Sequence, residues 1–213
     1  MTTSVLRIPS PSLPLWFVAA LAPMIVSEIV RLNQSDPMVW IAYDYLGRLA
    51  GLAVLAAVPA ARAIAFRDEQ CRVAWWEVTL WVIGLVIFDR IVDHSLTDQI
   101  NAMLPGTRIG RVPAPHGWLF VVDTFVGLAL VAYSEEVIFR RCGRALLRER
   151  FGDGATMIFL TAILFASYHW WTGVGNIAAT LLFGITAMLF YRRAGRLSPI
   201  ILVHYLCDVA DFS

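Results

Sequence analysis

Residues 118–139 read WLFVVDTFVGLALVAYSEEVIF, an apolar run of 22 residues that ends in two adjacent carboxylates. A helix needs about 20 apolar residues to cross the hydrocarbon core of a bilayer. The run therefore predicts a membrane-spanning helix. Glu135 and Glu136 stand where that helix should be leaving the bilayer, and Arg140 follows one turn later. An interfacial charge cluster is the simplest interpretation, and the rest of the chain has to show whether it is enough.

The whole chain has the composition of a membrane protein. Of its 213 residues, 59% are hydrophobic and 15% are charged, and the mean hydropathy is +0.68. Average soluble domains carry roughly 25% charged residues. The formal net charge of +1 gives no reason to expect a nucleic-acid partner. We therefore expect a single integral-membrane domain over residues 1–213. All 17 basic residues are arginines, which is typical of a GC-rich genome, and we place the chain in a bacterial inner membrane.

Seven apolar segments are long enough, or nearly so, to cross a bilayer. The sequence thus predicts an all-α, polytopic transmembrane helical bundle with about seven spans, and six or eight spans also fit. The first segment lacks a convincing cleavage site, so we expect a retained span and not a signal peptide. The connection 93–116 is polar and contains three prolines, which predicts a loop. The predicted spans are 13–29, 39–61, 73–92, 118–139, 155–171, 177–191 and 197–209.

The arginines agree with this count. With the N-terminus in the cytoplasm, 11 of the 17 arginines fall on the cytoplasmic side and four fall outside, as the positive-inside rule requires. The cytoplasmic set is Arg7, Arg62, Arg67, Arg72, Arg141, Arg144, Arg148, Arg150, Arg192, Arg193 and Arg196.

Several ionisable residues lie inside the predicted spans, where they are costly and by default suggest function. Asp44 and Arg48 are four residues apart on one helix face, and we interpret them as a structural ion pair. Glu136 and Arg140 have the same spacing. Glu135 is rotated from Glu136 by about 100°, so it is expected to point elsewhere, toward a water molecule.

Two histidines complete the set. His169 lies four residues after Phe165 on the fifth span, and His204 lies four residues before Asp208 on the seventh. Each has an ordinary structural explanation by itself, but a glutamate, a histidine and a His–Asp pair on three helices of a small bundle favour a reaction centre. A carboxylate can act as general base on a water molecule with help from a histidine, and a second histidine can donate to an oxyanion.

Other hydrolytic mechanisms fit less well. The chain contains neither a GxSxG elbow nor an HExxH zinc motif. Two histidines and a carboxylate can nevertheless bind a metal. We expect no cofactor, while a zinc-dependent version of the same hydrolase stays open.

Three motifs occur in the order EExxxR, FxxxH and HxxxD, and together they resemble the CPBP family of intramembrane proteases, also called the Abi or CAAX-protease-and-bacteriocin-processing family. The resemblance covers about residues 134–208. It implies that Glu135 is the catalytic base and acts on water with His169, and that His204 and Asp208 form the oxyanion site. It also implies that Glu136, Arg140 and Phe165 order the site.

One departure concerns the last motif position, which is often Asn in the family and is Asp208 here. An amide can donate to an oxyanion, whereas an ionised carboxylate cannot. Asp208 could instead orient His204, be protonated, or bind a metal.

The sequence therefore predicts an intramembrane endopeptidase of the glutamate type that hydrolyses a peptide bond of a membrane-associated protein or peptide. The alternatives are a non-proteolytic binding or immunity protein on the same scaffold and a metal-dependent form of the protease. A transporter is disfavoured, because no pair of Gly/Pro-broken helices recurs in the two halves of the chain. One conflict stands: the predicted boundaries put Glu135 and His169 at opposite ends of their spans, although one site needs both at the same depth.

Overall fold

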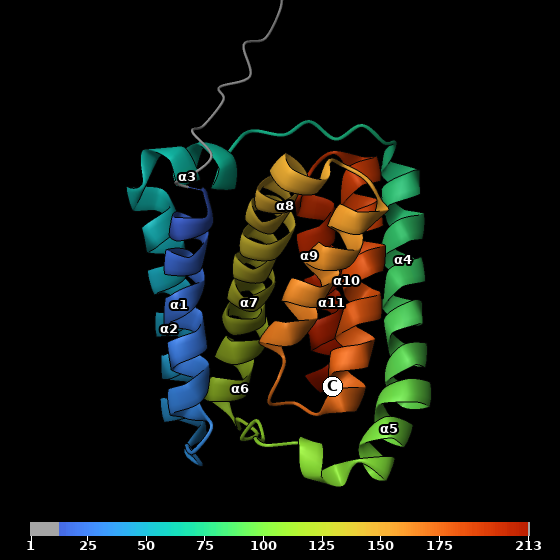
Figure 1. Cartoon of the computed structure of the whole chain (residues 1–213). Coiled ribbons are helices and arrows are strands. Elements are labelled where there is room, and N and C mark those ends of the chain that lie inside the picture. Colours follow the sequence, from blue (N-terminus) through green and yellow to red (C-terminus); the bar gives the residue numbers. More distant parts are fainter. Residues whose placement is uncertain (1–12, 213) are drawn as a thin grey trace, which may run out of the picture.

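The computed structural model describes residues 13–212, and every regular element in that range is a helix (Figure 1). The all-α prediction is confirmed, whereas Arg7 lies outside the described residues. The elements are α1 (Leu13–Arg31), α2 (Pro37–Ala57), α3 (Pro59–Ala65), α4 (Trp75–Val92), η1 (Asp93–Thr97), α5 (Asp98–Met103), η2 (Pro105–Thr107), α6 (Trp118–Val122), η3 (Asp123–Gly127), α7 (Leu128–Glu135), η4 (Glu136–Gly143), α8 (Arg144–Phe151), α9 (Ala155–Tyr168), α10 (Val174–Ala194) and α11 (Ser198–Phe212).

The chain is an integral membrane protein. Among the described residues, four helices are long and apolar enough to cross a bilayer, and these are Pro14–Arg31, Pro37–Ala57, Trp118–Phe151 and Val174–Ala194. Helix α4 contains three charged residues, and α9 and α11 have only 14 and 15 residues. Each of the seven predicted spans overlaps a helix, but seven as the number of membrane crossings remains a prediction.

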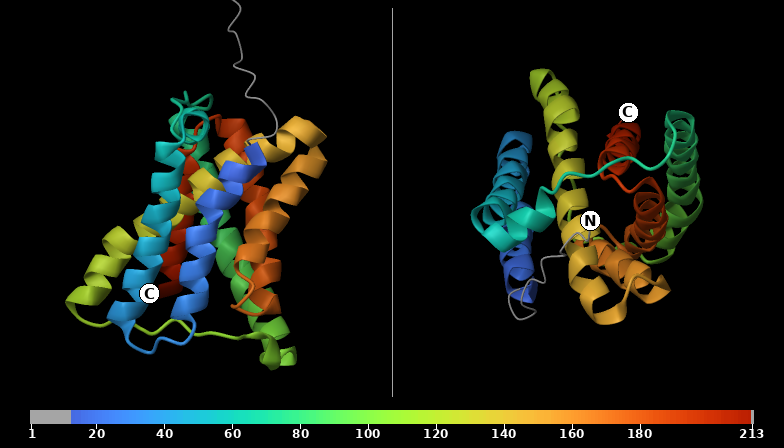
Figure 2. Two further views of the ribbon diagram at one scale, coloured as in Figure 1. Left: turned by 60° about the vertical axis from the view of Figure 1, so that its left-hand side comes forward. Right: turned by 90° about the horizontal axis from the view of Figure 1, so that it is seen from above.

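The bundle consists of a helical hairpin, a long central helix and a group of four helices. The hairpin α1–α2 lies on one side of the helix that runs from α6 to α8 (Figures 1 and 2). Helices α9, α10 and α11 lie on the other side, and α4 packs against α10 and α11 at the outer edge. The central helix therefore contacts both halves and can carry residues that join them.

The central helix corrects one predicted boundary. It continues from Trp118 to Phe151, whereas the predicted span ended at residue 139. The arginine-rich segment continues the helix, which ends where Gly152 adopts φ 71°. Glu135 consequently lies in the middle of a long helix, and the conflict in depth with His169 disappears. Two π-helical stretches interrupt the α-helix, and the second, η4, begins immediately after Glu135. Such stretches are frequent at functional sites.

Three other boundaries were wrong. Residues 93–103 were predicted as a loop but continue α4 as the helical segments η1 and α5. The second helix ends at Ala57 and not at residue 61, because Pro59 disfavours helical geometry at Val58. Helix α9, predicted as a span over residues 155–171, ends at Tyr168, so His169 lies in the turn that follows it.

Glycines bring α1 and α2 into close contact. A methyl group added at Gly51 would lie 2.6 Å from the carbonyl oxygen of Ala20, and one at Gly47 would lie 2.2 Å from the Ser27 hydroxyl. Small residues allow this kind of close backbone approach, which stabilises helix pairs inside membranes.

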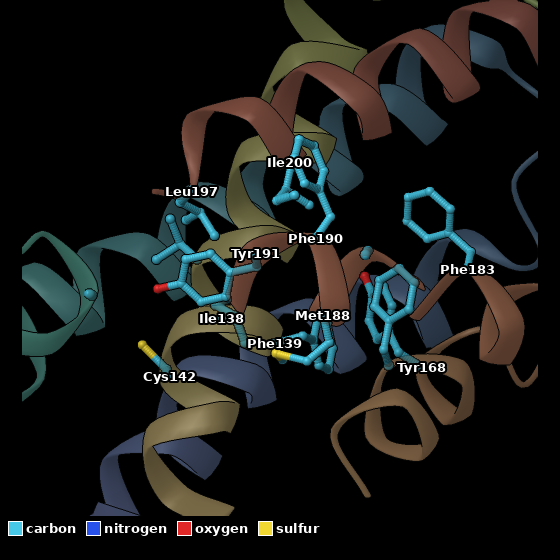
Figure 3. Packing of buried hydrophobic residues seen from close by; sticks show 14 of the residues in the cluster. Ile138, Phe139, Cys142, Tyr168, Phe183, Met188, Phe190, Tyr191, Leu197 and Ile200 are labelled. Atoms are coloured by element: carbon cyan, nitrogen blue, oxygen red, sulfur yellow. The ribbon is translucent and has the colours of Figure 1, made fainter. Parts of the chain in front are cut away.

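The apolar core contains buried residues from the central helix and from α9 and α10, part of which Figure 3 shows, and it extends to α1, α2, α3, α4 and α11. Phe139 packs edge-on against Phe165 with 5.4 Å between ring centroids, and Trp81 of α4 stacks on Phe190 at 5.0 Å. Because lipid tails are as apolar as these side chains, close packing rather than expulsion of water holds such a core together.

Glu69, in the connection between α3 and α4, binds side chains and backbone of several other elements. Its carboxylate accepts hydrogen bonds from Arg67 at 2.9 Å and from Tyr191 and Arg141, both at 2.5 Å, and from the backbone N–H of Leu197 at 3.0 Å. One buried side chain thereby ties the α3–α4 connection to η4, α10 and the start of α11.

The glycine contact predicts opposite effects for two identical substitutions. Gly51→Ala should lower thermal stability in detergent, since the new methyl group meets backbone and α1 must move. Gly84→Ala in α4 meets nothing within 4 Å and should stabilise by up to about 1 kcal/mol through helix propensity. Equal melting temperatures for the two variants would contradict the close packing of α1 on α2.

A pH effect follows from Glu69. Burial raises the pKa of this carboxyl, but the hydrogen bonds from Tyr191, Arg67 and Arg141 outweigh burial and lower the pKa below its ordinary value of 4.5. A lowered pKa in the folded state stabilises the fold above pH 4.5, and this contribution is lost as the pH falls through the folded-state value. Melting curves from pH 7 to 3 should show this loss, and Glu69→Gln should be less stable at pH 7 and less sensitive to acid. An identical acid dependence in the variant would exclude the assignment.

Candidate active site

The predicted site residues come together between the central helix, the end of α9 and α11. Glu135, Glu136 and His204 are buried, with 2%, 0% and 5% of their surfaces exposed. Such groups are stable inside a membrane protein only when they are paired with one another.

His204 lies between three carboxylates. Its Nδ1 is 2.8 Å from Glu136 Oε1, and because an ionised carboxylate only accepts, Nδ1 donates. Its Nε2 is 3.8 Å from Glu135 Oε2 and 3.7 Å from Asp208 Oδ1. Glu136 therefore fixes the ring, and Nε2 points toward the gap between Glu135 and Asp208. Contrary to the sequence-based expectation, the two adjacent glutamates both face the same histidine.

His169 is oriented by the backbone of its own turn. Its Nδ1 is 3.1 Å from the carbonyl oxygen of Phe165. A carbonyl can only accept, so Nδ1 carries the proton and Nε2 of the neutral ring is an acceptor. The Phe165 ring contacts both histidines edge-on, with centroid distances of 5.0 Å to His169 and 5.9 Å to His204. The FxxxH spacing thus places one phenylalanine between the two imidazoles.

Arg140 completes the predicted set. Its Nε lies 3.3 Å from Glu136 Oε2, and its guanidinium stacks 3.7 Å above the Phe165 ring. The predicted Glu136–Arg140 pair is present. Arg140 is 1% exposed, and stacking on an aromatic face is a favourable environment for a guanidinium.

Arg48 on α2 belongs to the site, which the sequence did not indicate. Its Nη1 donates to Glu135 Oε1 at 2.8 Å and to Ser134 Oγ at 3.1 Å. Its Nε donates to Asp44 at 2.9 Å, so the predicted Asp44–Arg48 pair also exists. The four-residue spacing predicted the pairing of Arg48 with Asp44. The same spacing contains no information about the contact of Arg48 with the distant central helix.

Two cavities meet at the histidines. One, of about 180 Å³, lies toward α1 and α2 and is lined by Glu135 among other residues. The second, also about 180 Å³, lies toward α4, α10 and α11 and includes Asp89, Asp93 and Asp211. The residues that line both are His169, His204 and Asp208. Each cavity has room for several water molecules.

A metal-dependent form of the site was one alternative that the sequence left open. Within residues 13–212, no group of three or more His, Cys, Asp or Glu side chains is arranged to hold a metal ion.

Residues 117–210 match the family described as type II CAAX prenyl endopeptidase Rce1-like. Comparisons with curated proteins and with solved structures found no match. The matched segment begins just before α6 and ends within α11, so it contains all three motifs. This match agrees with the motif resemblance to the CPBP/CAAX protease family. The hairpin α1–α2 lies outside the match.

The Glu136–Arg140 pair predicts strong coupling between two substitutions. Arg140→Met leaves the fully buried Glu136 without its cation and should destabilise by about 3–5 kcal/mol. Adding Glu136→Gln should recover part of the loss, with a coupling energy of about 1–3 kcal/mol in a double-mutant cycle measured by thermal unfolding in detergent. Additive losses would show that the two side chains do not act as a pair.

Proposed function

We propose that this chain is an intramembrane endopeptidase in which Glu135 activates a water molecule to hydrolyse a peptide bond. The observation that carries the proposal is the environment of Glu135. Arg48 donates a hydrogen bond to Oε1 of Glu135, whereas Oε2 has no hydrogen-bond partner among residues 13–212. Glu135 also shares a cavity with His169, His204 and Asp208. A carboxylate with one free oxygen beside a cavity is well placed to accept a proton from water.

The histidines supply the remaining roles. His169 Nε2 can accept a hydrogen bond from the same water molecule and orient it. The water oxygen attacks the scissile carbonyl carbon while its proton passes to Glu135. In its imidazolium form His204 carries a proton on Nε2 as well as on Nδ1, and Nε2–H donates a hydrogen bond to the resulting oxyanion without transferring the proton. Glu135 then delivers the proton to the departing nitrogen as the C–N bond breaks, which leaves a carboxylic acid and an amine.

Asp208 is assigned a positioning role in this scheme. It lies 3.7 Å from His204 Nε2 and is ionisable, so it can orient the imidazole but cannot itself donate to an oxyanion when ionised. An Asn at this position could donate directly. This chain therefore relies on His204 alone for that hydrogen bond.

The family implies a membrane-associated protein or peptide as substrate. Its name refers to prenylated CAAX sequences. For this chain we propose only the broader substrate class, a peptide segment held at the membrane. The part of that segment that carries the scissile bond must reach the two histidines through one of the two cavities that meet there.

The test is a comparison of protein termini in membranes from cells that carry the wild type or Glu135→Gln at equal expression. Termini present only with the wild type are expected, since loss of a general base costs about 10²–10⁴ in rate. The matched control is Glu149→Gln on the exposed face of α8, which should leave these termini unchanged. Identical termini in all three strains, with a wild-type phenotype that Glu135→Gln retains, would favour a binding or immunity protein instead.

A further inference from the structure

We propose that Arg48 is a positioning residue for Glu135, supplied by the hairpin α1–α2 that lies outside the matched family segment. The proposal rests on the function proposed above, since it assigns a role in the same reaction. Arg48 is 3% exposed and reaches from α2 to the central helix. A charge-assisted hydrogen bond of 2.8 Å to Glu135 Oε1 is of the strong kind.

A structural ion pair does not account for all of the contacts of Arg48. Asp44 already neutralises the guanidinium through Nε, with both carboxylate oxygens at 2.9 Å. If pairing were the whole role, Nη1 could face any acceptor. It instead binds Glu135 and its neighbour Ser134 on the central helix. The planar fork of arginine fixes both directions at once, which a flexible ammonium cannot do.

The position of Arg48 is fixed in turn by α1. Arg31 pairs with Asp44 on one side and with Glu28 on the other. Its guanidinium also lies 4.0 Å from the Trp40 ring centroid. Positive and negative side chains therefore alternate from α1 through α2 to the central helix, and the last member is Glu135. The complete order is Glu28, Arg31, Asp44, Arg48 and Glu135.

The geometry defines what the contact achieves. With Oε1 held by Arg48, the carboxylate of Glu135 cannot rotate to present either oxygen at random. Oε2 stays 3.8 Å from His204 Nε2, and both residues line the same cavity. A displacement of about 1 Å in a reacting group can cost 10²-fold in rate. Arg48 therefore acts through Glu135 on the chemical step and not on substrate binding.

The experiment uses the full-length protein in detergent with a peptide that spans a cleavage site found in the comparison of termini. Arg48→Ala should lower kcat by about 100-fold or more while KM changes by less than about threefold. Arg48→Lys keeps a cation beside Glu135 but not the two fixed directions of the fork, so it should recover about tenfold of that loss and remain below the wild type. The control is Arg141→Ala, a buried arginine that pairs with Glu69 away from the site, and its kcat per folded molecule should equal that of the wild type.

Misfolding is controlled by a second variant. Asp44→Asn with Arg48→Gln removes both charges of the pair, so that Asp44 is not left unpaired, and kcat should remain low although the protein folds. The proposal is overturned if Arg48→Ala matches Arg141→Ala in kcat, if only KM changes, or if Arg48→Lys recovers nothing. Full activity of Glu135→Gln would instead overturn the proposed function itself, so the two failures can be told apart.

Discussion

The pairing of buried charges is the constraint on which this structure depends. A charge inside a membrane protein is tolerated when a partner neutralises it, and removing one partner leaves an expensive unpaired group. Here the pairs are not isolated. Arg48 pairs with both Asp44 and Glu135. His204 pairs with Glu136 through Nδ1, and its Nε2 faces Asp208. Satisfying each charge thus forces three separate parts of the bundle to meet at one place.

Aromatic rings determine how the charged groups are spaced. Phe165 contacts the guanidinium of Arg140 and both imidazoles, so a single apolar side chain occupies the space among three groups that cannot neutralise one another. Each histidine keeps one ring nitrogen that is not used in fixing the ring. A reaction centre in a low-dielectric interior needs groups that keep a free hydrogen-bond donor or acceptor, and it needs them held apart and shielded from bulk water.

Periodicity and motif spacing were sufficient to predict the helical class, the region of each long helix and the residues that converge at the site. The exact helix ends were not predictable in the same way. The central helix continues through Arg140–Arg150 because those arginines find partners such as Glu136 and Asp153, which local hydropathy does not register. Arg48 was recognised as half of an intrahelical pair, but its contact with Glu135 depends on how α2 packs beside the central helix.

The alternating charges also bear on how the chain enters a bilayer during synthesis. The hairpin α1–α2 is made before the central helix, and its buried acids Glu28 and Asp44 are matched by Arg31 and Arg48 within the hairpin itself. It can therefore partition into lipid as a self-neutralised unit. Glu135 is made later, on the central helix, and pairs with Arg48 when that helix docks against the hairpin.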